Sequence, residues 1–110
     1  MIEEIVLNYL KEMLDVEVYM EIPEDMPENF VVLEKTGSSV EDHIYSATFA
    51  IQSYGKGIYE AMVLNEAVKK AMDNIITLNS VFSSKLNSDY NFTDTSIERN
   101  RYQAVFDLVY

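Results

Sequence analysis

Apolar side chains recur at helical spacing over the start of the chain. Seven positions fall three or four residues apart and would share one helical face: Ile2, Ile5, Val6, Tyr9, Leu10, Met13 and Leu14. Glu3 and Glu4 fall in the first turn, where the helix dipole favours negative charge. A helix lying on a membrane surface would need Lys and Arg on its polar face, and this face is mainly acidic. The pattern therefore predicts a helix that packs on a core.

Alternating apolar and polar residues follow, which is typical of half-buried strands. We expect a strand over 16–22, a loop over 23–29 that holds both prolines, and a second strand over 30–35. Residues 36–39 are predicted to form a turn, and a third strand over about 43–53 would complete a hairpin. In the third strand one face would carry Tyr45, Ala47, Phe49 and Ile51, and the other Ser46, Thr48 and Gln52.

The second half begins with a chain break at Gly55-Lys56-Gly57 and a helix predicted over about 58–78. Alanines in its buried stripe imply a close approach to the sheet; the stripe is Ala61, Leu64, Val68, Ala71, Ile75 and Leu78, with Ala67 and Met72 beside it. The pattern over 81–92 is ambiguous between an edge strand and a turn, and 91–100 has the character of a loop. A terminal strand is expected over 102–110.

The predicted order is therefore α-β-β-β-α-β-β in a single domain covering residues 1–110. We expect an α+β fold with a mostly antiparallel sheet of four to five strands and two helices packed on one face. The other face must meet water or another subunit, and the apolar residues expected there are Val31, Leu33, Val105 and Val109. Together with eight tyrosines, these residues favour an oligomer; the alternative is that they lie at sheet edges under loops.

The charge of the chain is strongly negative and uneven. The formal net charge is −11, of which residues 1–55 contribute −10 and residues 56–110 contribute −1. The first half therefore lacks the clustered Lys and Arg that bind nucleic-acid phosphates. The acidic start of the chain does not suggest a secretion signal, no apolar run is long enough for a membrane helix, and no cysteine is present.

Candidate chemistry is sparse. His43 follows Glu41 and Asp42 but has no neighbouring nucleophile, and a solvated histidine in a hairpin is the simpler interpretation. Gly55-Lys56-Gly57 lacks the spacing of a phosphate-binding loop, and the acids of 23–29 lack the spacing of a calcium loop. We therefore expect no enzyme activity, no metal and no cofactor.

Three segments together resemble one protein family. Pro23-Glu24-Asp25-Met26-Pro27-Glu28-Asn29-Phe30-Val31-Val32 leads into Lys35-Thr36-Gly37, Phe49-Ala50-Ile51-Gln52-Ser53-Tyr54 leads into Tyr59-Glu60-Ala61, and Tyr90-Asn91-Phe92-Thr93-Asp94 precedes Arg101-Tyr102-Gln103-Ala104-Val105-Phe106. The chain resembles, over nearly its whole length, the small tail-terminator (tail-completion, tail-to-head joining) proteins of long-tailed bacteriophages and prophages. It departs from them in having Tyr54 where a tryptophan is frequent and Ser38 where a second glycine is frequent.

The resemblance implies a structural virion protein without catalysis or cofactor. Six copies would form a ring at the head-proximal end of the tail tube, end the polymerisation of the tube and join tail to head. The implied partners are other copies of the chain, the tail tube protein and a head-completion or connector protein, met in the host cytoplasm during assembly. DNA would pass through the ring without being specifically bound, and no membrane would be involved.

Candidate residues for that role fall into two groups. Aromatic residues and arginine are enriched at interfaces, so we expect a subunit or tube contact at Tyr54, Tyr59, Arg99, Arg101 and Tyr102. The alternative for the two arginines is solvent exposure beside Asp94 and Glu98. Acids that face passing DNA would discourage adhesion at short range. These would come from the hairpin, as Glu34, Glu41 and Asp42, or from the 23–29 loop.

The rival hypothesis is a small acidic phage-encoded inhibitor that mimics DNA and binds a host DNA-binding protein. Mimicry needs carboxylates spread along an elongated face at phosphate-like spacing. The acids of this chain are concentrated in its first half, which counts against this alternative.

Overall fold

The computed structural model describes residues 1–110 and confirms the predicted α+β class and element order. Two helices and a short 3-10 helix accompany one five-stranded sheet of strand order β1-β2-β3-β5-β4. Only β1 and β2 pair in parallel, and the other neighbours are antiparallel. The elements are α1 (Ile2–Met13), β1 (Glu17–Tyr19), β2 (Phe30–Glu41), β3 (Ile44–Gly55), α2 (Ile58–Asp73), η1 (Ile75–Thr77), β4 (Ser83–Asn91) and β5 (Asn100–Val109).

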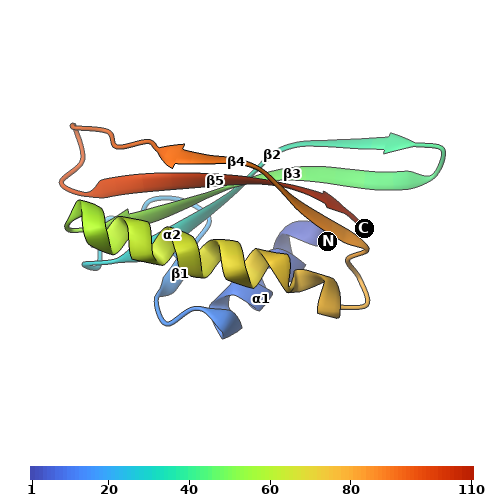
Figure 1. The fold of residues 1–110 in the computed structure, drawn as a ribbon, viewed down its shortest axis with the longest axis horizontal. Helices are drawn as coiled ribbons and strands as arrows, with labels where there is room; N and C mark the ends of the chain where they lie inside the picture. The colour runs from blue at the N-terminus through green and yellow to red at the C-terminus, as the bar shows by residue number, and fades with distance from the viewer.

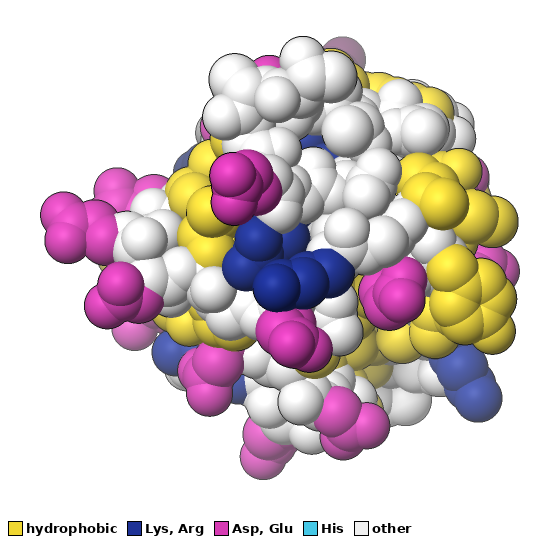
Figure 2. Space-filling view, turned by 90° about the vertical axis from the view of Figure 1, so that its left-hand side faces the viewer, with side chains coloured by type: hydrophobic (Ala, Val, Ile, Leu, Met, Phe, Trp, Pro, Cys, Tyr) yellow, Lys and Arg dark blue, Asp and Glu magenta, His cyan; other side chains and the backbone are white.

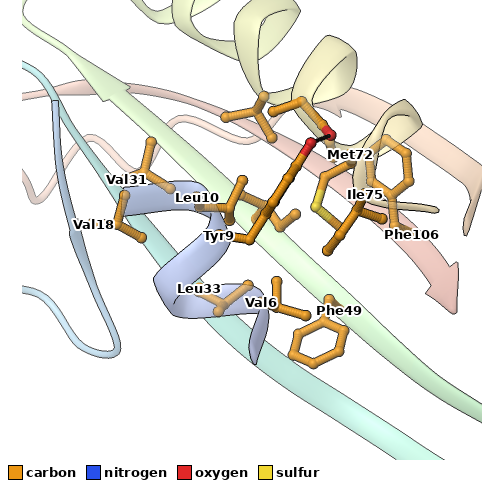
Figure 3. Close-up of a cluster of buried hydrophobic side chains, with 14 of the residues drawn as sticks. Val6, Tyr9, Leu10, Val18, Val31, Leu33, Phe49, Met72, Ile75 and Phe106 are labelled. Carbon is orange, nitrogen blue, oxygen red and sulfur yellow. Dashed lines mark hydrogen bonds between the residues drawn. The ribbon is translucent and has the colours of Figure 1, made fainter. Parts of the chain in front are cut away.

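Both helices lie on one face of the sheet, and the main core fills the space between them and the strands (Figures 1 and 3). Val6 and Leu10 of α1 meet Phe49 of β3 and Phe106 of β5 there, and all four side chains are fully buried. On α1 these residues belong to the apolar stripe of the helix, and on β3 and β5 they are among the alternate residues whose side chains point toward the helices. The packed face of the sheet is therefore the one predicted from the periodicity of β3 and β5.

One hydrogen bond ties the two helices together inside this core. The hydroxyl of Tyr9 on α1 donates to the carbonyl oxygen of Ala71 on α2 at 2.6 Å (Figure 3). Burial raises the pKa of the Tyr9 phenol, because the charged phenolate is disfavoured away from water. The Ala71 carbonyl lies in the last turn of α2 and also accepts the backbone N–H of Asn74 at 3.1 Å.

Replacing Tyr9 by phenylalanine should lower the free energy of unfolding by about 1 kcal/mol at neutral pH, since the hydrogen bond to Ala71 is lost. A tyrosine whose pKa is raised by folding contributes stability fully below the unfolded pKa of about 10, and loses it as the pH rises further. Urea unfolding at pH 7 and above pH 10 checks both effects. The difference between the two proteins should shrink at the higher pH, and a constant difference would contradict the linkage.

The β2–β3 hairpin is longer than the sequence predicted, and the predicted turn at 36–39 is wrong. Those residues belong to β2, which runs on to Glu41 and projects with β3 beyond the helices (Figure 1). The chain turns instead at Asp42 and His43, which have positive φ angles of 51° and 66°. Asp and His tolerate this left-handed region better than most residues do, and a tight hairpin turn requires it. The register shift between Lys35 and Gly37 is a bulge within the strand.

The faces of β2 also differ from the prediction. Val31 and Leu33 were expected on the second face, but both are fully buried in the main core under the helices. Phe30 and Val32 occupy the second face, where they form a separate small cluster with Tyr54. Both faces of the sheet are buried at the start of β2, so four consecutive residues there are apolar. Without alternating polar residues, the sequence does not indicate which side chains face the helices.

Two elements are shorter than the sequence indicated, and one ambiguous stretch is now assigned. The first strand is limited to Glu17–Tyr19, and α2 ends at Asp73 before a turn of 3-10 helix. The ambiguous stretch over 81–92 contains the edge strand β4, whose pairing with β5 shifts between Leu86 and Ser88. The helices of the structure fall short of the length and apolarity that a bilayer-spanning helix requires.

Candidate functional site

A row of hydrogen-bonded polar side chains crosses the second face of the sheet. The hydroxyl of Tyr54 donates to Oε1 of Gln52 at 3.0 Å and accepts from Nη1 of Arg101 at 3.0 Å. Nε2 of Gln52 donates to Oε1 of Gln103 at 2.9 Å, and Nε2 of Gln103 donates to the hydroxyl of Tyr90 at 2.7 Å. The row links β3, β5 and β4, so polar side chains, among them the predicted Gln52, occupy the middle of the second face.

Tyr54 is a packing residue of its own chain. Its ring stacks on Phe30 with the centroids 4.5 Å apart and an angle of 4° between the planes. Tyr19 packs edge-on against the same Phe30 ring at 6.0 Å. Because only 1% of Tyr54 is exposed, its position does not support the expectation that it contacts another subunit.

Arg101 lies beside this cluster at the start of β5. Its guanidinium is 4.4 Å from the centre of the Phe92 ring, and Nε donates to the carbonyl oxygen of Phe92 at 2.7 Å. Hydrogen bonds from the backbone and hydroxyl of Ser96 hold the pKa of Asp94 below its usual range, and the charge of Arg101 adds to the effect. The half-buried guanidinium of Arg101 thus organises the start of the 92–99 loop.

Arg99 fastens two loops to each other. Its Nη2 donates to the carbonyl oxygens of Met26 and Pro27 at 3.1 and 2.8 Å, and Nε also donates to Pro27 at 3.1 Å. These bonds hold the 23–29 loop against the 92–99 loop over one end of the sheet. The bonds to Met26 and Pro27 were not predicted, and the expected interface contact of Arg99 stays a prediction because the structure holds one chain.

Replacing Arg99 by lysine should release the 23–29 loop, because a single ammonium group does not reproduce the planar fork that bonds two carbonyls. We expect limited proteolysis within this loop to become about tenfold faster, which corresponds to about 1.4 kcal/mol of local stability. Replacing Lys70 by alanine is the control, since Lys70 is exposed and distant in sequence from both loops. Equal cleavage rates in the two variants would contradict the assigned role of Arg99.

The predicted lumen-facing acids lie along the hairpin but do not form a cluster. Glu34, Glu41 and Asp42 are all exposed, and none has an ion-pair partner in the chain. Glu34 lies on the second face of the sheet, whereas Asp42 is in the hairpin turn. About seven residues of extended chain separate Glu34 from the tip, a distance on the order of 23 Å.

An apolar groove lies between the end of α1 and the start of α2, and the sequence analysis did not identify it. The groove, about 310 Å³ in volume, is lined by Met13, Leu14, Tyr59, Val63, Leu64 and Ala67, together with Asp15, Val16, Asn29 and Glu60. We call it the α1–α2 groove. Tyr59 is 71% exposed and Val63 51%, so these two side chains are open to a partner. Of the predicted interface residues, Tyr59 is the most accessible, while Tyr102 is half-buried in β5.

Two further apolar surfaces are open. Phe82, in the turn before β4, is 75% exposed, and Ile76 of the neighbouring η1 is 53% exposed. The hairpin tip carries Val40, Ile44 and Tyr45, each about half exposed or more. Scattered surface apolar residues are ordinary, but groups of them mark candidate contact surfaces.

Charged side chains are unevenly placed at the end of the molecule that holds the start of α2 and the 92–99 loop. Figure 2 looks onto this end and shows basic side chains gathered in the centre, with separate acidic side chains around them and hydrophobic side chains to one side. Lys56, Arg99 and Arg101 belong to the elements that meet here, and none of them forms an ion pair within the chain.

No group of three or more metal-ligating side chains is present in the structure, and His43 is exposed in the hairpin turn. Comparison with known proteins adds no identification: no family model matches the chain, and no curated protein matches it. The features that remain for a functional argument are therefore the open surfaces.

Proposed function

We propose that this protein is a structural virion protein of the tail-terminator kind, forming a ring, with six copies expected, that caps the head-proximal end of a phage tail tube. The ring would end tube polymerisation and join the tail to a head-completion or connector protein. The resemblance over 23–37, 49–61 and 90–106 supports the family, and the open surfaces support the assembly.

The observation that carries the proposal is that the exposed apolar surfaces are unlike one another and lie apart. The α1–α2 groove is concave and lies at the start of α2. Phe82 and Ile76 protrude beyond the other end of α2. Surfaces that do not match themselves favour head-to-tail contacts, which close into a ring when the rotation between subunits fits.

The acids of the hairpin suit a wall past which DNA moves. Glu34, Glu41 and Asp42 are exposed and have no ion pair within the chain, so no basic side chain of the protein offsets their negative charge. At physiological salt the screening length is about 8 Å, so repulsion acts only on DNA close to the wall. A projecting hairpin with such acids would discourage adhesion without blocking passage (Figure 1).

Electron microscopy and light scattering of the purified protein test the proposal. We expect ring-shaped particles, or monomers that assemble into a ring on the ends of isolated tail tubes and stop their growth. A chain that stays monomeric or dimeric, ignores tail tubes and displaces DNA from a host DNA-binding protein would overturn the ring and favour the inhibitor.

A further inference from the structure

Phe82 is an aromatic side chain left almost entirely in water. It precedes β4, and the backbone N–H of Phe82 donates to the carbonyl oxygen of Val109 at 2.8 Å, which fixes the segment to the sheet. The ring is nevertheless 75% exposed and makes no aromatic contact with the rest of the chain. An exposed aromatic ring on a backbone that is fixed to the sheet suits insertion into a partner, since the backbone loses little conformational freedom on binding.

The α1–α2 groove has the size and character to receive such a ring. Its volume is about 310 Å³, and seven of its ten lining residues are hydrophobic. An apolar cavity of about 150 Å³ is enough to bind benzene, so one phenyl ring fits.

The segment around Phe82 and the wall of the groove differ in charge. The groove wall includes residues of the 12–29 segment, which holds seven acids and no Lys or Arg. Glu60 on the α2 side adds another acid, and Lys56 lies just before that helix. The segment 74–88 around Phe82 contains no acid and one lysine, Lys85, although the chain as a whole has 19 acids. Phe82 therefore lies in an acid-free stretch of the chain, and this stretch meets less repulsion at the acidic groove wall than an acidic segment would.

Other occupants of the groove from this chain are disfavoured by the same charges. The hairpin tip offers apolar side chains but also Glu41 and Asp42, which the acidic wall would repel. Two grooves facing each other would bring two copies of the 12–29 segment together, with the same penalty. The charge distribution therefore disfavours a groove-to-groove contact between two copies.

We propose that Phe82 of one copy inserts into the α1–α2 groove of the next copy, between Met13, Tyr59 and Val63. Tyr59, Val63 and Ala67 line the groove from α2, and Phe82 follows η1 beyond the C-terminal end of that helix (Figure 1). Val63 is ten residues before Asp73, which is about 15 Å along the helix axis. Neither part can reach its counterpart within one chain. The inference rests on the proposed function in that this contact would join neighbouring subunits of the ring.

Two variants that each remove one half of the contact test the proposal. Phe82→Ser removes the inserted ring, and Val63→Glu places a charge in the groove; both side chains are at least half exposed, so folding should be unaffected. Each variant alone should raise the dissociation constant for self-association at least tenfold, measured by sedimentation. Mixing the two should produce a one-to-one dimer that grows no further, because one intact Phe82 then faces one intact groove.

A matched control is available on the same helix. Met62→Glu places the same charge on the adjacent residue of α2, which is 45% exposed and does not line the groove. This control should assemble like the unaltered protein, and loss of assembly in it would overturn the assignment of the contact.

The outcomes separate this contact from the ring itself. Rings that persist in both Phe82→Ser and Val63→Glu would overturn the contact and leave the proposed function standing. Open filaments or dimers that depend on both residues would support the contact and overturn the ring. A chain that remains monomeric at every concentration and on tail tubes would overturn both.

Discussion

Replacing Leu33 by alanine is expected to lower the free energy of unfolding by about 2–5 kcal/mol. Leu33 is fully buried between the sheet and the helices, where it belongs to the main core with Leu10 of α1 and Phe49 of β3 (Figure 3). Removing its isobutyl group loses the transfer free energy of that group and leaves a cavity that close-packed neighbours fill only in part. Urea unfolding followed by circular dichroism measures the change.

The control for Leu33 lies on the same strand. Val40 is 61% exposed near the hairpin tip, and its replacement by alanine should change the free energy of unfolding by less than about 0.5 kcal/mol. A small effect at both positions would mean that Leu33 faces the open side of the sheet, as its sequence pattern suggested. A large effect at Leu33 alone establishes the observed orientation of β2.

The helices, the fold class and the faces of β3 and β5 follow from periodicity because one side of each element is buried and the other is wet. In β3 the buried Ala47, Phe49 and Ile51 fall on the predicted face, although Ala50 on the other face is buried as well. The start of β2 violates that condition. A small second cluster around Phe30 buries the opposite face as well, so the pattern there carries no information about direction.

The turn of the β2–β3 hairpin was predicted at the wrong residues for a different reason. The composition of 36–39, with one glycine and two serines, is typical of a turn, yet these residues remain paired with β3 around a bulge. The actual turn uses Asp42 and His43 in the left-handed region, a less frequent choice than Asn-Gly. Local composition is a weak guide to the position of a turn where the partner strand continues, because hydrogen bonds to that strand stabilise the extended conformation.

The candidate site was only partly predictable because its parts are brought together over long sequence distances. The sequence singled out Arg99 for an interface and gave no sign of its partners within the chain, the carbonyls of Met26 and Pro27, which lie more than seventy positions away. The α1–α2 groove is formed by the ends of two helices. The sequence does contain a signal for the groove, because Tyr59 and Val63 are apolar residues of α2 that fall outside its buried stripe.

The approach of α2 to the sheet depends on a glycine at the end of β3. Gly55 is buried, and a Cβ atom built on it would lie 2.6 Å from the backbone nitrogen of Ala61 and 3.0 Å from the carbonyl carbon of Glu60. Both atoms belong to the backbone of the first turns of α2, so no side-chain rotation can relieve the contact. The helix itself must move, and with it Tyr59 and the wall of the α1–α2 groove.

Replacing Gly55 by alanine is therefore expected to cost about 3 kcal/mol, near the upper end of the usual range for overpacking. For a domain of this size the midpoint of thermal unfolding should fall by roughly 10–20 °C. Gly37→Ala is the matched control, because a Cβ at Gly37 meets no atom within 4 Å. That variant should be neutral or slightly stabilising, since alanine restricts the unfolded chain more than glycine does. Equal melting temperatures in the two variants would show that α2 can shift freely at its first turn, and the groove would then not be a rigid feature of the fold.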